Sequence, residues 1–290
     1  MLIHPLLKTP RLFFLILVLP LRSFPVLSQQ PAAPPLPDIR QLMREVMDHQ
    51  KQMEKVREND TYTSLITTQD IDSNGQVTKT ETEEAENFFV NGHLIARSVK
   101  KNGQPLDAHG EQKETARVTK LVEKAQSVPS GQPLEGQTIN ISRLLDIMDV
   151  RNPRRENYHG RAAIVFDFFG RKDAATHGLV EDASKKLQGT IWIDEADRQV
   201  AHLEVSFNDN FHVAGGLLAN IQKGSNFRFD QAGVTDGLWL PTGGEGTMQA
   251  RILLLKNLRQ HIVERDYDYK RFRVEAQQSK EATAVTEKRQ

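Results

Sequence analysis

The sequence predicts a mainly β protein of the α+β class whose strands are antiparallel. Three observations support this prediction. From Thr61 on, most of the chain alternates apolar and polar residues with the two-residue period of a strand. Asn-Gly dipeptides at 74–75 and 91–92 separate such segments and favour the tight turns of hairpins. The stretch 187–207 reads as two strands whose apolar residues share one face, which is typical of a sheet buried on one side.

The first residues have the order of a secretory signal peptide. Basic residues precede an apolar run at 12–19, and small residues at Val26 and Ser28 provide the spacing of a cleavage site. The run is shorter than the roughly 20 residues that span a bilayer, and Pro20 interrupts it. We therefore expect export, with cleavage after Ser28, rather than a retained membrane anchor.

Composition divides the rest of the chain. We predict a signal peptide at 1–28, a stiff proline-rich linker at 29–37, one domain at 38–275 and a disordered polar tail at 276–290. No repeat or second linker divides the domain. The polar composition of the last segment gives it nothing to bury.

Cysteine content and net charge exclude several classes of protein. The 290 residues contain no cysteine, which excludes disulfides, thiol nucleophiles, cysteine-ligated metals and a lipidated cysteine. Lys plus Arg and Asp plus Glu number 38 each, so no long-range field attracts nucleic acid or an anionic membrane. We expect a periplasmic or secreted protein with no nucleic-acid partner that is not an integral membrane protein.

The first element of the domain is an amphipathic helix. Asp38 can cap it, and apolar residues recur at three- and four-residue steps to about Arg57. Several of these residues are methionines, among them Met43 and Met53. Methionine suits an adaptable binding surface, but a helix packed on a sheet explains the same stripe, and we favour that interpretation.

A strand meander and two helices are expected next. Strands at 61–71, 76–90 and 93–101 follow one another through short turns. The charged segment 110–126 favours a surface helix or a lid, with a loop after it. A short helix is expected at about 142–148.

The remainder reads as antiparallel strands. We expect them at 150–158, 161–169, 187–207 (the hairpin), 225–231 and 238–241, and as a final pair, 247–255 and 260–274, joined around 256–259.

The apolar residues and the turn of the hairpin predict how its two strands pair. A turn from Glu195 to Gln199 places Ile193 opposite Ala201, and Ile191 opposite Leu203. A slip of one residue would send one apolar set to the wrong side of the sheet. This register makes the hairpin apolar on one face only.

The segment 70–81, DIDSNGQVTKTE, matches the calcium loop of an EF-hand. Its Asp70, Asp72, Asn74 and Glu81 would supply the oxygen ligands. An EF-hand loop joins two helices, however, and strand formers flank this segment. We interpret it as a hairpin turn and predict no metal site.

Residues that could support catalysis are few. The nine histidines form no H-E-x-x-H, and the chain has no P-loop or G-x-S-x-G. Asp266 and Asp268, with Lys270 on the same face of a strand, could share a proton or a metal, but alternating charge on a solvated face explains them more simply. His202 and His212 lack a convergent partner. We predict no catalytic residue, no cofactor and no enzyme.

The apolar strands pose the main functional question. The strand 161–169 is apolar on nearly both sides, so either other elements cover both faces or one face lines a cavity. Candidate cavity residues are the apolar residues on one face of this strand and of the hairpin: Ile164, Phe166, Phe168, Ile191, Ile193, Leu203, Val205 and Phe207.

The passages HGRAAIVFDF (159–168) and GTIWIDEADRQVAHLEV (189–205), in this order of elements, resemble the periplasmic outer-membrane lipoprotein-sorting (LolA-like) superfamily, which also includes relatives that sense envelope stress. The likeness spans about 38–274. It implies a curved antiparallel half-barrel with helices over its concave face. In the lipoprotein carriers, that face receives acyl chains. The charged segment 110–137 and the polar strand TKTETEEAEN depart from those carriers and leave the cargo open.

We therefore expect an exported, non-enzymatic binding protein that holds an acyl chain, a lipid or a lipoprotein between the sheet and the helices at 38–57 and 142–148. The alternative is an envelope scaffold or stress-sensing protein that acts through contact with other envelope proteins. The carrier predicts a cavity, whereas the scaffold predicts a filled core and an exposed patch.

Overall fold

Strands occupy most of the chain after its first helix. The computed structural model describes residues 35–129, 134, 141–235, 238–253 and 255–271. The predicted signal peptide, most of the linker and the predicted tail lie outside these residues, so their boundaries stay predictions. The chain divides into two units, Met1–Pro35 and Leu36–Gln290, and every element below belongs to the second.

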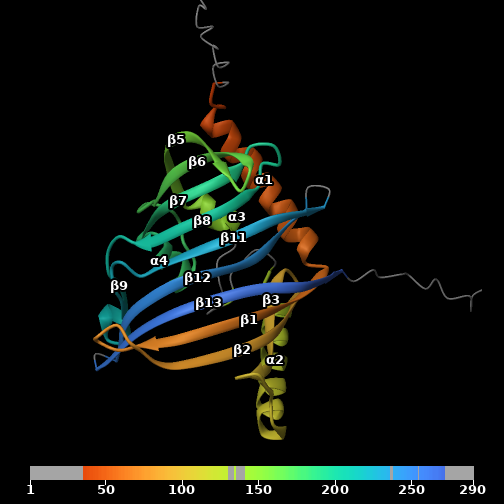
Figure 1. The fold of residues 1–290 in the computed structure, drawn as a ribbon, viewed down its shortest axis with the longest axis vertical. Coiled ribbons are helices and arrows are strands. Elements are labelled where there is room, and N and C mark those ends of the chain that lie inside the picture. Colours follow the sequence, from red (N-terminus) through yellow and green to blue (C-terminus); the bar gives the residue numbers. More distant parts are fainter. Residues whose placement is uncertain (1–34, 130–133, 135–140, 236–237, 254, 272–290) are drawn as a thin grey trace, which may run out of the picture. The chain divides into compact units, whose positions relative to one another are not determined.

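The described residues form thirteen strands of one antiparallel sheet. Their bounds are β1 (Asp60–Ile71), β2 (Val77–Val90), β3 (His93–Lys101), β4 (Gln104–Pro105), β5 (Met148–Tyr158), β6 (Arg161–Gly170), β7 (Leu187–Asp194), β8 (Val200–Phe207), β9 (Phe211–Val213), β10 (Ala219–Ile221), β11 (Asn226–Thr235), β12 (Leu238–Ile252) and β13 (Lys256–Arg271). The order is β4-β3-β2-β1-β13-β12-β11-β8-β7-β6-β5, with β10 beside β12 and β9 beside β10 (Figure 1). Because β4 and β5 stand at opposite ends of this order, the sheet is open.

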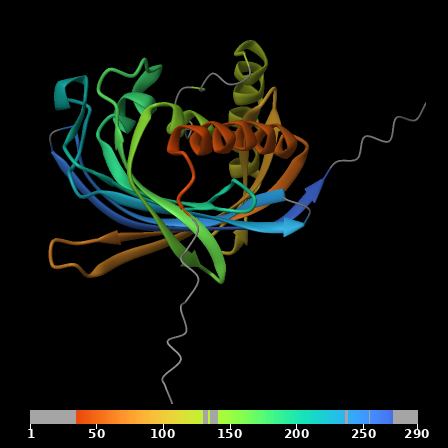
Figure 2. The ribbon, with the colours of Figure 1, turned by 90° about the horizontal axis from the view of Figure 1, so that it is seen from above.

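The helices in the described residues are α1 (Ile39–Arg57), α2 (Ala108–Ser127), α3 (Ile141–Asp146) and α4 (Gly178–Ser184), with a 3-10 turn η1 (Ala214–Gly216). The sheet is curved, and α1 lies across its concave side (Figure 2). The Asp38 carboxylate caps α1 by accepting a hydrogen bond from the Gln41 backbone N–H at 2.8 Å, as predicted. No helix in the described ranges is long and apolar enough to cross a membrane.

This architecture confirms the predicted fold class, a mainly β, curved antiparallel half-barrel with helices over its concave face. The predicted helices correspond to α1, α2 and α3, and the predicted meander to β1–β3. The hairpin register is half confirmed. Ile191 pairs with Leu203 as predicted, but Ile193 pairs with Val200, because a β-bulge after Trp192 shifts the register.

The last two strands differ from the prediction. The segments expected at 238–241 and 247–255 are one strand, β12, and its turn into β13 comes earlier than 256–259, because Lys256 already pairs with Ile252. Gly243 does not break the strand. A Cβ there would lie 2.1 Å from the Glu264 carbonyl oxygen of β13, so glycine permits close approach of the two strands.

Two apolar clusters stabilise the unit. The larger lies between α1, α3 and the strands β5–β8 and β11. The smaller joins α2 to β3 through Ala125 and Ile95. The charged segment predicted as a surface helix or a lid is therefore α2, whose apolar residues pack in this second cluster.

Candidate functional site

The candidate cavity residues gather on one face of three neighbouring strands. Phe166 pairs with Ile191 and Ile164 with Ile193, so side chains two residues apart form rows across β6, β7 and β8. Seven of the eight are between 0 and 4% exposed, and the eighth, Phe207, packs against them half-buried. The alternation of the strands thus brings all eight predicted residues together.

Two helices cover this face. From α1, Leu42 and Val46 are buried against it, and the methionine stripe contributes Met43 and Met47 at the edge of the cluster. From α3, the two leucines of the segment ISRLLD are buried. Because side chains such as Phe166 have no accessible surface, α1 and α3 fill the space over them in this structure.

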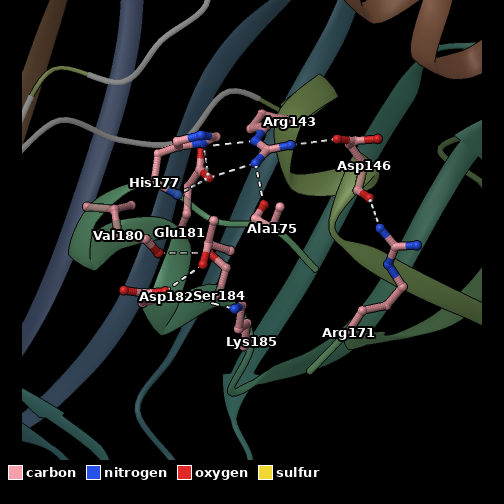
Figure 3. A network of polar contacts seen from close by, with 11 residues as sticks. Arg143, Asp146, Arg171, Ala175, His177, Val180, Glu181, Asp182, Ser184 and Lys185 are labelled. Carbon is pink, nitrogen blue, oxygen red and sulfur yellow. Dashed lines mark hydrogen bonds and ion pairs between the residues drawn. The ribbon is translucent and has the colours of Figure 1, made fainter. Parts of the chain in front are cut away.

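An ion pair between half-buried Arg143 and buried Glu181 attaches α3 to α4 (Figure 3). The Arg143 guanidinium donates from Nε and Nη2 to the two carboxylate oxygens of Glu181, at 3.0 and 2.8 Å. Glu181 is 1% exposed, and the hydrogen bonds from Arg143 hold the pKa of its carboxyl below the ordinary value. Such a bidentate, charge-assisted pair fixes both position and orientation.

Further contacts surround this pair. Arg143 also donates from Nη2 to the Ala175 carbonyl oxygen at 2.7 Å and from Nη1 to Asp146 at 2.6 Å. The backbone N–H of His177 donates to Glu181 at 2.8 Å. Figure 3 shows these groups converging from α3, α4 and the segment before α4. The network therefore fixes α3 to the unit.

The polar contacts of α1 are dispersed along the helix and range from half-exposed to buried. Glu45 is 3.1 Å from Arg198, and His49 Nδ1 is 3.1 Å from the Asp197 carbonyl oxygen. Gln50 is buried and donates to the side-chain oxygen of Gln199 at 2.8 Å, while its own Oε1 has no partner. These contacts all reach the turn between β7 and β8. None of them is a bidentate ion pair like that of Arg143 with Glu181.

The C-terminal end of α1 is held differently. Arg57 is buried, donates to Gln231 at 3.5 Å, and burial lowers the pKa of its guanidinium. Only Glu58 and Asn59 separate α1 from β1. This end of the helix is therefore tethered, and the end near Asp38 is farther from the tether.

Beyond the apolar cluster, the concave face becomes polar. The Ser64 hydroxyl donates to Asp266 at 2.6 Å and accepts from the Asn87 amide at 2.7 Å. Glu264 lies two residues before Asp266 on β13, and the rings of Tyr62 and Tyr269 stack at 4.8 Å. Burial raises the pKa of Glu264 to about 6 and raises the pKa of Asp266 as well.

The simple interpretation of the acidic pair on β13 was wrong for Asp266. Asp266 is half-buried with Ser64, whereas Asp268 is exposed, has a φ of 57° and bonds to Lys270 at 2.8 Å. A register shift between Thr61 and Thr63 places a β-bulge at Asp268 and Tyr269, so the two carboxylates have different surroundings.

The calcium-like segment is a hairpin turn, as predicted. The Asp72 carboxylate accepts from the backbone N–H groups of Asn74 and Gln76 at 2.9 and 2.8 Å. Asp70 accepts from the Gln260 amide instead of turning toward Asp72. Within the described residues, no group of three or more His, Asp or Glu side chains could hold a metal ion.

His202 has partners that the sequence did not reveal. Its Nδ1 is 2.6 Å from Asp230, its Nε2 is 3.3 Å from Glu204, and Tyr158 donates to Asp230 at 3.0 Å. Burial lowers the pKa of His202, but the two carboxylates more than compensate and leave it raised. Tyr158, His202 and Asp230 line a groove of about 530 Å³ on the outer face of the sheet. His212 is exposed on β9.

The chain was compared with known proteins. No protein-family model and no curated protein matches it. Among solved structures, it is similar to a DUF1329 family protein from Desulfovibrio piger, at 12% identity over 79% of this chain and 92% of that chain, with a TM-score of 0.35. It is also similar to an outer membrane lipoprotein-sorting protein domain from Vibrio parahaemolyticus, at 12% identity over 84% and 98%, again with a TM-score of 0.35.

The second of these proteins is of the class that the sequence resembles.

Proposed function

We propose that this chain is an exported, non-enzymatic binding protein that holds an apolar ligand, such as an acyl chain, against the concave face of its half-barrel. The ligand takes the place that α1 occupies in the closed form. One observation carries the proposal: a continuous apolar face on β6, β7 and β8 lies beneath a helix whose polar contacts are dispersed and partly exposed. Export rests on the predicted signal peptide at 1–28.

The two covering helices differ in how they can move. The bidentate pair of Arg143 and Glu181 keeps α3 in place, since opening it would leave the buried Glu181 charge without its partner. Half-exposed, single-contact pairs such as Glu45 with Arg198 contribute less, because neither charge is fully buried. We therefore assign the movable lid to α1, which pivots about its end at Arg57.

The energies of opening and of binding are of similar size. Lifting α1 exposes Leu42, Val46 and the partly buried residues beside them, at about 1.5–3 kcal/mol for each fully buried side chain. An acyl chain gains about 0.8 kcal/mol for each methylene that it buries. A chain of about ten methylenes therefore offsets the opening, and a much shorter chain does not.

The test weakens the packing of α1 against the sheet. In the variant Leu42→Ala, the closed form loses about 2–4 kcal/mol, so a fluorescent fatty acid should bind at least tenfold more tightly than it binds the wild type. Fluorescence titration measures both affinities. The matched control is Ile95→Ala, which removes an equally buried side chain from the second cluster, away from α1. It should lower stability without changing affinity.

The complete burial of the concave face favours a second candidate, the scaffold or stress sensor with a filled core. In that case neither the wild type nor Leu42→Ala binds the fatty acid at any concentration below its micelle formation. An equal increase in fatty-acid affinity in Leu42→Ala and Ile95→Ala would also contradict the assignment of α1 as the lid. It would indicate that the ligand binds to any destabilised form of the protein.

A further inference from the structure

Two turns meet at one end of the sheet, where β9, β12 and β13 end (Figure 1). One is the segment 214–218 with η1, and the other joins β12 to β13. The backbone N–H of Leu253 donates to the Leu218 carbonyl oxygen at 3.0 Å, and Ala219 pairs with Ile252. The two turns are therefore side by side and form one tip.

Leucines cover this tip. The exposed fractions are 63% for Leu217, 54% for Leu218, 61% for Leu253 and 89% for Leu255, and we call these four residues the leucine tip. Three of them are the most exposed large apolar side chains in the part of the chain that the structure describes. Single exposed leucines are ordinary, but four on two adjoining turns form a patch that folding leaves uncovered.

Three cationic residues lie beside the leucine tip. Arg251, Lys256 and Arg259 are exposed on the two strands that carry the turn, and none of them forms an ion pair with a described residue. The segments 211–223 and 246–263 contain no Asp or Glu. The nearest carboxylate by pairing is Asp70, opposite Gln260, and it accepts a hydrogen bond from that amide.

We propose that the leucine tip and these three cations bind the surface of an anionic lipid bilayer. Apolar side chains at the apex of turns enter the boundary between headgroups and acyl chains, while basic residues behind them meet anionic headgroups. The two turns form only a small apex. A stable protein–protein interface, by contrast, usually buries about 800 Å² of surface on each partner. Although the net charge of the chain is zero, the segment 246–263 that carries the turn has only basic charges.

The test places a reporter on the tip. Because the chain has no cysteine, Leu255→Cys in the full chain takes a single environment-sensitive fluorophore. With vesicles of phosphatidylcholine and phosphatidylglycerol, its emission should shift to the blue and brominated acyl chains should quench it. With phosphatidylcholine alone the shift should be small. This local signal does not depend on any membrane binding by the apolar run at 12–19.

Two further variants decide the outcome. Leu179→Cys, labelled in the same way, reports from an exposed leucine on α4 and should show no shift. Adding Arg251→Gln and Lys256→Gln to Leu255→Cys should weaken binding to the anionic vesicles about tenfold or more, with an unchanged unfolding midpoint. An unshifted label at 255, an equal shift at 179, or a shift caused by protein concentration without vesicles would overturn the proposal, the last by indicating a second copy as the occupant.

Discussion

At the scale of single residues, burial sets how Glu264 titrates. Its pKa rises from 4.5 to about 6, because the half-buried carboxyl beside Asp266 resists ionisation. The folded state keeps this proton at pH values where the unfolded chain has lost it. Stability from this group is therefore complete below about pH 4.5 and is lost as the pH rises through about 6, a change of up to about 2 kcal/mol.

The variant Glu264→Gln should remove this loss. We expect its free energy of unfolding to exceed that of the wild type by up to about 2 kcal/mol at pH about 7.5, and to match it at pH about 4. Urea unfolding at the two pH values measures the difference. Glu123→Gln, an exposed position on α2, is the control and should change neither value. A gain of the same size at both pH values would assign the effect to something other than titration.

At the residue scale, the sequence predicts local features of a strand but not contacts between strands that are distant in the chain. The alternation of β6, β7 and β8 correctly placed the eight apolar candidates on one face, because it is a local property of a strand. The pairing of His202 with Asp230 was missed, since it depends on β11 lying beside β8. The different surroundings of Asp266 and Asp268 could not be predicted, because a bulge at Asp268 has no signature in the sequence.

At the scale of elements, the ion pairs of Arg143 with Glu181 and Asp146 should hold α3 in place. Glu181→Gln keeps the shape of the side chain but removes the charge that Arg143 faces in a buried setting. We expect a loss of about 3 kcal/mol in the free energy of unfolding. Asp146→Asn changes a half-exposed partner of the same guanidinium and should cost less than about 1 kcal/mol. Similar losses in the two variants would show that burial of the pair does not matter.

Element prediction succeeded where local chemistry decides the structure. The cap at Asp38 and the Asn-Gly turns located α1 and the β1–β3 meander. The strands β9 and β10 have three residues each, too few for a period to be visible, and both were missed together with α4. The prediction of two strands, 238–241 and 247–255, was wrong because a glycine such as Gly243, required by the close approach of two strands, looks the same in a sequence as one that ends a strand.

At the scale of the whole molecule, the proposed function is an equilibrium between a closed form, in which α1 fills the concave face, and an open form, in which a ligand does. Whether the face is covered could not be predicted from the strands alone. It depends on the docking of α1 and α3, and that docking depends on contacts as distant as Gln50 with Gln199.

This equilibrium predicts how ligand length and lid strength combine. For saturated fatty acids from about 8 to about 16 carbons, each added methylene should tighten binding about fourfold until the apolar face is filled. Leu42→Ala changes only the population of the open form and none of the ligand's contacts with β6, β7 and β8, so it should tighten binding by one common factor at every length. Competition with a fluorescent fatty acid gives both series of affinities. Plotted as the logarithm of affinity against chain length, they should be parallel lines. Lines that converge at long chains would mean that Leu42 contacts the bound chain, and α1 would then be a wall of the site rather than its lid.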